Sequence, residues 1–447
     1  MAISILYSLV SVVIVLGIMI VVHEFGHFAA AKYFGVRVEV FSVGFGKRLL
    51  GFTRGETDYR ISALPFGGYV KMSGENPMES RTGDPGEFMS HPRWQRFVIA
   101  IAGPFMNILL AVVLLTIVFM VHNEQPVYLD QPAVIGWVVE NSPAEKAGLQ
   151  PGDRIIRYGS MQNPTWEDVL SKVMLSPNYP VDIAVQRGTE VLNKSVVPEA
   201  VGQEQIGSAG WIPDAPTTVS ELESGQPAEK AGIKVGDEIV AINGTSIRST
   251  QVMVRMLQQT ADKPVEMTVV RDGKEVKFTL APVLNDLNGR KQYRIGVGTE
   301  PAVHVDKLPF TKAFAKSVDQ NKRYSMLILD LVKRMVERKV SIKQMSGPIG
   351  IAKISGEAAR QQGWTPIMMV MAAISLNLGI FNLFPIPILD GGLILLLLIE
   401  AVIRRDISQT VKERIYQAAF VCLILFAGLV IFNDVVKLLP GLTKHVQ

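Results

Sequence analysis

Four apolar stretches in this 447-residue chain are long enough to cross a membrane, at about 3–31, 97–121, 364–384 and 415–432. A helix needs about 20 predominantly apolar residues to span roughly 30 Å of hydrocarbon. No charged residue lies between Ile3 and Val22 in the first stretch. Because only helices and closed barrels can span a bilayer, the sequence predicts a polytopic α-helical membrane protein with about four transmembrane helices.

The composition is typical of a chain that is part membrane protein and part soluble protein. Hydrophobic residues make up 48% and charged residues 19%, below the roughly 25% charged residues of soluble domains. The net charge is only +4, and the basic residues gather beside the apolar stretches. We therefore expect the lipid bilayer as a partner and no nucleic acid.

The distribution of basic residues predicts how the chain crosses the membrane. No Lys or Arg precedes the first apolar stretch, so it lacks the positive start of a signal peptide and we expect an uncleaved helix. Lys and Arg fill the two short loops, at Lys32, Arg37, Lys47, Arg48, Arg54, Arg60, Lys71, Arg93, Arg96 and at Arg404, Arg405, Lys412, Arg414. The positive-inside rule places these loops in the cytoplasm, and both termini and segment 122–363 on the other side.

Segment 125–300 contains an internal repeat that is offset by 84 residues. SPAEKAGL at 142–149 returns as QPAEKAGI at 226–233, and PGDRII at 151–156 returns as VGDEIV at 235–240. Both copies resemble the PDZ domain, which binds an extended peptide at a sheet edge and often captures a C-terminal carboxylate. By this resemblance the binding loops lie near 206–212 and 294–297. The alternative is that one or both copies are spacers or size filters.

The motif HEFGH near the end of the first apolar stretch indicates a metal site. His23 and His27 are four residues apart, which places both imidazoles on one helix face, where they can bind one zinc ion. Glu24 follows the first imidazole and can deprotonate a water at the metal. Ionisable groups inside a membrane are costly and usually functional. The alternative is a polar helix end that lipid headgroups satisfy.

A catalytic zinc takes three protein ligands, and Asp390 is the best candidate for the third. It follows FPIPIL at 384–389 and precedes two glycines, with apolar residues on both sides. Prolines break a helix, glycines allow close backbone approach, and a broken helix at membrane depth is tolerated only inside protein or beside a cavity. Asp390 could instead cap a helix end. Glu400 is the other acid, and we expect it to pair with the basic residues at 404–405.

Taken together, these motifs resemble the site-2 protease family of intramembrane zinc metalloproteases. The resemblance rests on HEFGH, the two PDZ-like copies and NLFPIPILDGG at 382–392, and it is closest to the bacterial, sigma-E-regulating type with tandem PDZ domains. GGYVKM at 67–72 and SGPI at 346–349 match the same group. One departure is Leu393, where many relatives carry His after the two glycines.

The resemblance implies a role for each candidate site residue. His23, His27 and Asp390 are expected to hold Zn²⁺, with Glu24 as the general base. Asn382 is expected to contact the substrate backbone or the oxyanion. Asn107 matches a further family motif in the second apolar stretch, and simple helix packing would account for it equally well.

The resemblance also implies the substrates and the location. Expected substrates are single-pass membrane proteins whose outer domain has already been trimmed, such as an anti-sigma factor, or signal-peptide remnants. The PDZ pair is expected to take peptide C-termini or to exclude bulky outer domains. The expected location is the bacterial cytoplasmic (inner) membrane, with the PDZ domains on the periplasmic side.

The expected fold is a polytopic α-helical membrane protein with a membrane-associated β-hairpin and two extracytoplasmic α/β PDZ domains. We expect the β loop to pair with substrate as an edge strand, or to be a plain cytoplasmic hairpin. We expect the amphipathic helix to lie at the membrane surface or against the PDZ pair, the alternative being a soluble helix packed into a PDZ core. The expected segments are 1–34 (first helix with HEFGH), 35–96 (β loop), 97–121 (second helix), 125–212 and 213–300 (PDZ domains), 301–363 (amphipathic segment), 364–400 (third helix with LDGG), 401–414 (cytoplasmic loop) and 415–437 (fourth helix).

Three other functions are compatible with parts of the pattern. A membrane-anchored PDZ scaffold with a structural metal site predicts binding without turnover, and the presence of Glu24 argues against it. A zinc protease acting on soluble peptides conflicts with the membrane depth of His23 and Asp390. A metal transporter would need more acidic residues within its helices than this chain offers.

Overall fold

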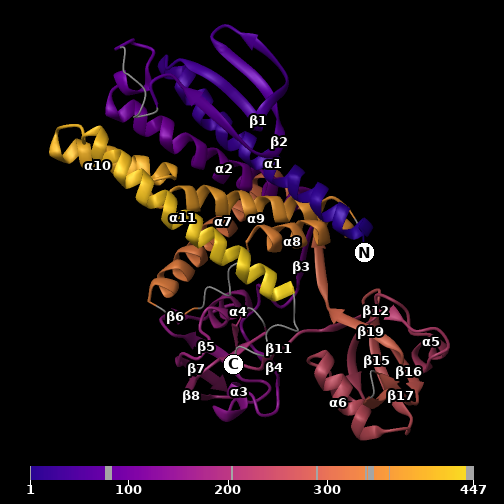
Figure 1. Cartoon of the computed structure of the whole chain (residues 1–447). Helices are drawn as coiled ribbons and strands as arrows, with labels where there is room; N and C mark the ends of the chain where they lie inside the picture. Colours follow the sequence, from indigo (N-terminus) through magenta and orange to yellow (C-terminus); the bar gives the residue numbers. More distant parts are fainter. Residues whose placement is uncertain are drawn as a thin grey trace. The chain divides into compact units, whose positions relative to one another are not determined.

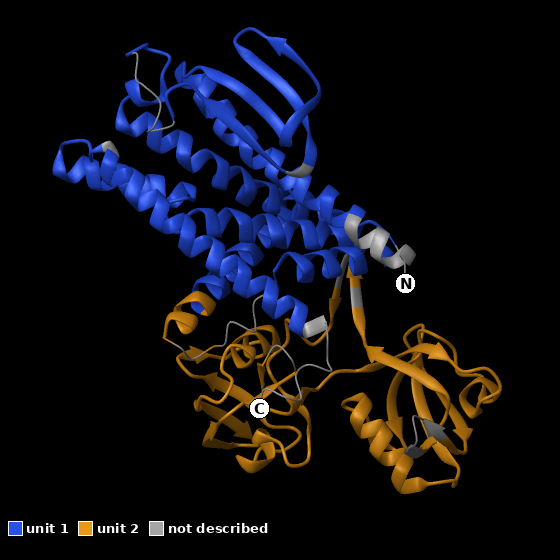
Figure 2. Ribbon diagram, viewed as in Figure 1, with its two compact units in different colours: residues 1–122, 307–330, 345–447 blue, residues 123–306, 331–344 orange. Residues whose placement is uncertain are grey.

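The computed structural model describes residues 2–75, 83–202, 205–287, 290–337, 340, 347–361 and 363–438. It divides into two compact units (Figure 2), a helical unit of residues 1–122, 307–330 and 345–447 and a β-rich unit of residues 123–306 and 331–344. Ser346 of the SGPI motif lies outside the described residues.

The helical unit contains helices and one β element (Figure 1). Its elements are α1 (Ala2–Phe34), β1 (Val38–Arg54), β2 (Thr57–Met72), η1 (Phe88–Ser90), α2 (Arg93–Val121), the first part of α7 (Phe310–Val336), α8 (Pro348–Arg360), α9 (Thr365–Asn382), α10 (Asp390–Ile403) and α11 (Gln409–Leu438). In the described residues, four helices are long and apolar enough to span a membrane, at Val10–Phe34, Arg93–Val121, Thr365–Asn382 and Thr410–Val436. The predicted polytopic fold with about four transmembrane helices is confirmed.

A non-helical break at residues 383–389 separates the third span, α9, from the short helix α10 that follows it. The break carries Pro385 and Pro387, which cannot donate backbone hydrogen bonds. A side chain at Gly391 would lie 2.3 Å from the carbonyl oxygens of two residues in the break, and one at Gly392 would lie 2.2 Å from a third. The two glycines therefore allow the first turn of α10 to pack directly against the backbone of the break, which orients Asp390.

The β element is more complex than a plain hairpin. Phe41 of β1 lies opposite both Tyr59 and Val70 of β2, so the first half of β1 has one part of β2 on each side. The last stretch of β2, residues 68–72, pairs with β1 along one side. The other side of this stretch faces α1, where a side chain at Gly68 would meet atoms of Ile20 and Glu24 within 3.5 Å.

Helix α7 packs against α2 in the helical unit. Ala313, Ser317 and Asn321 form its buried stripe, and the Ser317 hydroxyl donates a hydrogen bond of 2.7 Å to the carbonyl oxygen of Val112 on α2. The sequence favoured a position at the membrane surface or against the PDZ pair. The C-terminal end of α7 does contact the first repeat copy, where Arg334 donates hydrogen bonds to the carbonyl oxygen of Leu175 and the hydroxyl of Ser176. The contact with α2 was not predicted, and small and amide side chains on one helix stripe allow it.

The β-rich unit contains two copies of one fold. The elements of the first copy are β4 (Ile135–Val138), α3 (Pro143–Lys146), β5 (Arg154–Tyr158), β6 (Met161–Gln162), α4 (Trp166–Met174), β7 (Val181–Arg187), β8 (Glu190–Val196), β9 (Glu199–Val201), β10 (Ile206–Ser208) and β11 (Trp211–Pro213). Those of the second are β12 (Thr217–Leu222), α5 (Pro227–Ala231), β13 (Glu238–Ile242), β14 (Thr245–Ser246), α6 (Thr250–Thr260), β15 (Val265–Arg271), β16 (Lys274–Leu280), β17 (Val283–Leu287), β18 (Arg290–Arg294) and β19 (Val297–Pro301). A separate strand pair, β3 (Asn123–Pro126) with β20 (Val303–Asp306), joins the two ends of this region.

Each copy contains its own Arg–Asp ion pair, at the equivalent position. Arg187 donates to both carboxylate oxygens of Asp153, at 2.7 and 2.8 Å, and to the carbonyl oxygen of Gly148. In the second copy Arg271 makes the matching contacts to Asp237 and Gly232. Both aspartates are buried, and each copy has its own apolar core. The 84-residue sequence repeat is therefore a structural repeat.

Candidate metal centre

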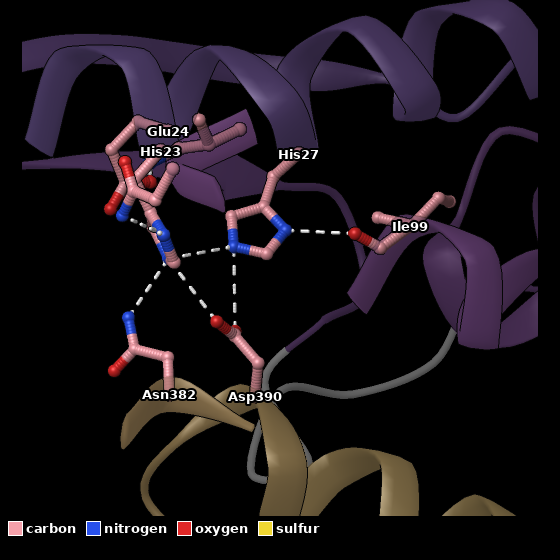
Figure 3. A network of polar contacts seen from close by, with 8 residues as sticks. His23, Glu24, His27, Ile99, Asn382 and Asp390 are labelled. Carbon is pink, nitrogen blue, oxygen red and sulfur yellow. Dashed lines mark hydrogen bonds and ion pairs between the residues drawn. The ribbon is translucent and has the colours of Figure 1, made fainter. Parts of the chain in front are cut away.

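Helix α1 presents its two histidines toward a single point. His23 and His27 are 7% and 8% exposed, and their Nε2 atoms lie 3.2 Å apart. Asp390, the first residue of α10, completes the group, as Figure 3 shows. Its Oδ2 lies 3.1 Å from Nε2 of His23, and its Oδ1 lies 3.4 Å from Nε2 of His27. Residues that are far apart in the sequence thus bring three ligand atoms together.

The chemistry and spacing of these three donors fit zinc. Bonds of about 2.0–2.1 Å in a tetrahedron place neighbouring ligand atoms roughly 3.3 Å apart, and the observed separations are 3.1, 3.2 and 3.4 Å. Two imidazoles and one carboxylate are the ligand set of many catalytic zinc sites. In the described parts of the chain, this is the only group of three or more such side chains close enough to share an ion.

Glu24 lies beside this group and contacts the β element. Its Oε2 accepts a hydrogen bond of 3.0 Å from the backbone N–H of Val70 on β2. Glu24, His27 and Asp390 line one cavity of about 220 Å³, together with residues of β2. A carboxylate in this place can exchange a proton with a water in the cavity.

Asn382, the last residue of α9, also faces the ligand atoms. Its amide nitrogen lies 3.3 Å from Nε2 of His23 (Figure 3). The amide N–H groups are therefore close enough to contact a carbonyl oxygen bound beside the three ligands. The five residues to which the resemblance assigns a role in binding or catalysis lie around one point: His23, Glu24, His27, Asn382 and Asp390.

Helix α2 contributes groups that sequence reasoning missed or left open. Nδ1 of His27 lies 2.8 Å from the carbonyl oxygen of Ile99 (Figure 3), and Nδ1 of His23 lies 3.1 Å from the side-chain amide of Asn107. A side chain at Gly103 would lie 2.3 Å from Nε2 of His27 and 2.9 Å from Nε2 of His23. Gly103 and Asn107 belong to one motif, GPFMN at 103–107, and Asn107 was a candidate by that motif. The carbonyl of Ile99 has no signal in a single sequence, because every residue carries one.

Glu75 is a second acidic group near the site that the sequence did not indicate. It lines the 220 Å³ cavity and also an adjoining cavity of about 530 Å³. Its Oε2 accepts a hydrogen bond from the N–H of Met72 at 3.3 Å. Burial raises the pKa of the Glu75 carboxyl to about 7, because a low-dielectric surrounding disfavours its charged form.

The larger cavity also has a buried ion pair in its wall. Oε1 of Glu400 on α10 lies 2.6 Å from Nζ of Lys412 on α11, and it accepts a hydrogen bond from the N–H of Ile407. The expected pairing of Glu400 with Arg404 or Arg405 is therefore wrong. Arg404 adopts a left-handed conformation with φ of 56°, which ends α10 and turns the chain so that Lys412 returns to Glu400.

The chain is similar to known proteins over most of its length. The model of peptidase family M50 matches residues 11–426. A putative zinc metalloprotease of Vibrio cholerae is 33% identical over 97% of this chain and all of that protein, and the regulator of sigma-E protease of Escherichia coli is 32% identical over the same shares. The PDZ domain of an SdrC-like protein of Listeria monocytogenes covers 20% of this chain and 90% of its own, at 19% identity and a TM-score of 0.18.

Proposed function

The chain belongs to peptidase family M50 and is an intramembrane zinc metalloprotease, and we propose that it cuts single-pass membrane proteins within or near their transmembrane segment. The observation that carries this proposal is the position of the metal centre. Two of its three ligands and Glu24 lie on α1, within the candidate span Val10–Phe34. The third ligand follows the break after the candidate span Thr365–Asn382.

The side chains around the centre have complementary roles in peptide hydrolysis. His23, His27 and Asp390 hold the zinc ion, which when bound supplies a Lewis acid that polarises the scissile carbonyl and acidifies water. Glu24 takes the proton of the attacking water and passes it to the leaving amine. The amide of Asn382 donates to the oxygen on which negative charge develops.

The β element has a role in holding an unwound substrate. A peptide bond in a transmembrane helix is protected by its own helix, and backbone groups freed in lipid need new partners. Residues 68–72 of β2 border the site beside Glu24, and strand addition along them would replace the lost hydrogen bonds. A substrate held there runs past Glu24 toward the ligand atoms.

The two repeat domains and the relatives' activity suggest which proteins are cut. One relative is named as a regulator of sigma E, and substrates of this chain would then be a pre-trimmed anti-sigma factor or signal-peptide remnants. The repeat domains take the new C-terminus of a trimmed substrate or exclude untrimmed outer domains. The basic loops support an orientation with those domains and both termini outside the cytoplasm of a bacterium, in its inner membrane.

A cleavage assay on the purified full chain tests the proposal. Wild type and Glu24→Gln are compared on a single-span test substrate in detergent, with zinc content measured for both proteins. We expect about one zinc in each, and cleavage within the span by the wild type alone. Equal zinc and no cleavage by either protein, against several truncated substrates, would instead support a membrane-anchored scaffold with a structural metal site.

A further inference from the structure

One face of α2 matches the two histidines of α1 residue by residue. Ile99, Gly103 and Asn107 are spaced by four, so they lie on one face of α2. The carbonyl of Ile99 meets His27, the amide of Asn107 meets His23, and Gly103 lies between them beside both Nε2 atoms. Helix α2 supplies no zinc ligand, yet Ile99 and Asn107 contact the Nδ1 atoms of both histidines, and Gly103 leaves room beside their Nε2 atoms.

The contact to Ile99 determines which nitrogen of His27 can bind metal. A carbonyl oxygen only accepts hydrogen bonds, so Nδ1 of His27 carries the proton that it donates. The lone pair of the neutral imidazole is then on Nε2, which faces Asp390. Histidine ligands of zinc usually donate their second N–H to a carbonyl or carboxylate in this way.

His23 needs the same arrangement, and Asn107 is the group that can provide it. Nε2 of His23 faces Asp390, so Nδ1 has to carry the proton and needs an acceptor. The amide nitrogen of Asn107 lies near Nδ1 of His23, while its Oδ1 is buried with no hydrogen-bond partner. The nitrogen and the oxygen of an amide have nearly the same shape. Rotating the Asn107 amide by 180° about its Cβ–Cγ bond exchanges them and makes the unpartnered oxygen the acceptor of the Nδ1–H of His23.

Helix α9 holds Asn107 in position. Asn107 is fully buried, and its backbone carbonyl accepts a hydrogen bond of 2.8 Å from the hydroxyl of Ser375. A side chain at Gly379, one turn further along α9, would lie 3.4 Å from Cβ of Asn107 and 2.9 Å from the carbonyl oxygen of Pro104. The two helices therefore pack closely at Asn107, which restricts the rotamers of the amide.

We propose that Asn107 is a positioning residue of the zinc site, whose side-chain oxygen accepts the Nδ1–H of His23 and so keeps Nε2 of His23 free to bind the ion. The proposal rests on the zinc site of the proposed function. It predicts that a side chain with an acceptor at position 107 preserves zinc affinity and that an apolar side chain of similar size does not.

Zinc binding tests the proposal without reference to catalysis. The dissociation constant for zinc is measured on the full-length protein in detergent by competition with a chelator, for wild type, Asn107→Leu and Asn107→Asp. We expect Asn107→Leu to weaken binding about 10- to 100-fold and Asn107→Asp to equal or exceed the wild type, because a carboxylate accepts the same proton. The melting temperature of each metal-free protein reports separately on packing.

Thr116→Val is the matched control. Thr116 lies on the same helix, is buried, and donates a hydrogen bond to the carbonyl of Val112, so its loss should affect folding without changing zinc affinity.

Equal zinc affinity of Asn107→Leu and the wild type would overturn the proposal. So would an Asn107→Asp variant as weak as Asn107→Leu, since the amide would then be a donor. If Asn107→Leu fails to fold, Asn107→Ala, which is smaller and also lacks an acceptor, takes its place in the same comparison. A wild type that binds no zinc would instead refute the proposed function.

Discussion

The carboxylate of Glu24 and the backbone N–H of Val70 are joined by a hydrogen bond of 3.0 Å. Val70 pairs with Phe41 on one side of β2, and the N–H that it donates to Glu24 points to the other side of that strand, which no strand of the described residues occupies and which faces α1. A substrate added as a strand along this side would need the same N–H. The proposed general base and the proposed substrate therefore compete for one donor, and substrate binding would release Glu24 toward water.

Replacing Val70 with Pro tests this relationship, because proline has no N–H and is tolerated in edge strands. We expect kcat/KM to fall about 10- to 100-fold, the equivalent of one charged-group hydrogen bond, with zinc content unchanged. Val70→Ala keeps the N–H and is the control. Equal kcat/KM for the two variants on a single-span substrate would show that this N–H has no part in turnover.

Gly103→Ala should remove zinc from a protein that still folds. The added methyl group would lie 2.3 Å from Nε2 of His27, closer than any non-bonded contact allows, and the imidazole would have to leave the ion. Gly17→Ala on α1 is the matched helical control, because the methyl group added there would have no neighbouring atom within 4 Å outside the helix backbone. Zinc content after dialysis and the helical circular dichroism signal distinguish loss of metal from loss of fold, and a zinc-loaded Gly103→Ala would contradict the site geometry.

Lys412→Met should destabilise the helical unit more than a paired substitution does. Glu400 is fully buried and its Oε1 lies 2.6 Å from Nζ of Lys412, so removing the lysine strands a buried charge at a cost of about 3–5 kcal/mol. The double variant Glu400→Gln/Lys412→Met removes both charges and should recover most of that loss. Thermal unfolding in detergent of these two variants, of Glu400→Gln and of the wild type measures the coupling. Additive effects of the two single changes would mean that the pair is not coupled.

Acid should weaken the second repeat domain through Asp237. Burial alone would raise the pKa of its carboxyl, but hydrogen bonds from Arg271 and from the N–H of Lys234 outweigh burial and lower that pKa below its ordinary value. Since the folded-state pKa is the lower one, the stabilisation is complete above the ordinary pKa of about 3.9 and is lost as pH falls through the folded-state pKa.

Asp237→Asn should therefore lose about 1.5–3 kcal/mol at pH 7 and lose little more on acidification. Hydrogen exchange of β13 and β15 in the full chain, corrected for intrinsic rates and compared between pH 7 and about pH 3, measures this. Glu266→Gln, which removes an exposed pair with Lys277, is the control and should change exchange little. A wild type that shows no acid-dependent loss of protection would contradict the role of Asp237.

The sequence predicted those features that depend on local pattern. Apolar runs predicted the four long helices, and the spacing of HEFGH placed His23 and His27 on one face, because both follow from helix geometry alone. Asp390 could be predicted as a ligand because an acidic side chain among apolar residues after a broken helix is costly unless it has a partner such as a metal ion. The repeat was visible because the segments at 142–156 return with an offset of 84 residues at 226–240.

Features that depend on which helices meet could not be predicted in this way. The carbonyl of Ile99 exists at every residue and only becomes a partner of His27 once α1 lies against α2. Glu400 was assigned to the nearest basic residues in sequence, but the turn at Arg404 brings Lys412 to it instead. The contact of α7 with α2 was not predicted, because a polar stripe is equally compatible with water, lipid headgroups or another helix. The contact of its C-terminal end with the first repeat copy agrees with the prediction.

The four-residue spacing that α1 and α2 share has a consequence for how the protein assembles. Sliding one helix by a single residue, about 1.5 Å, would separate His27 from Ile99 and His23 from Asn107 at once. Zinc affinity therefore depends on the register of α1 against α2. By linkage, bound zinc stabilises the correct register relative to the neighbouring ones. Zinc binding and the packing of α1 against α2 are then coupled, so that a pair of helices in the wrong register binds zinc weakly.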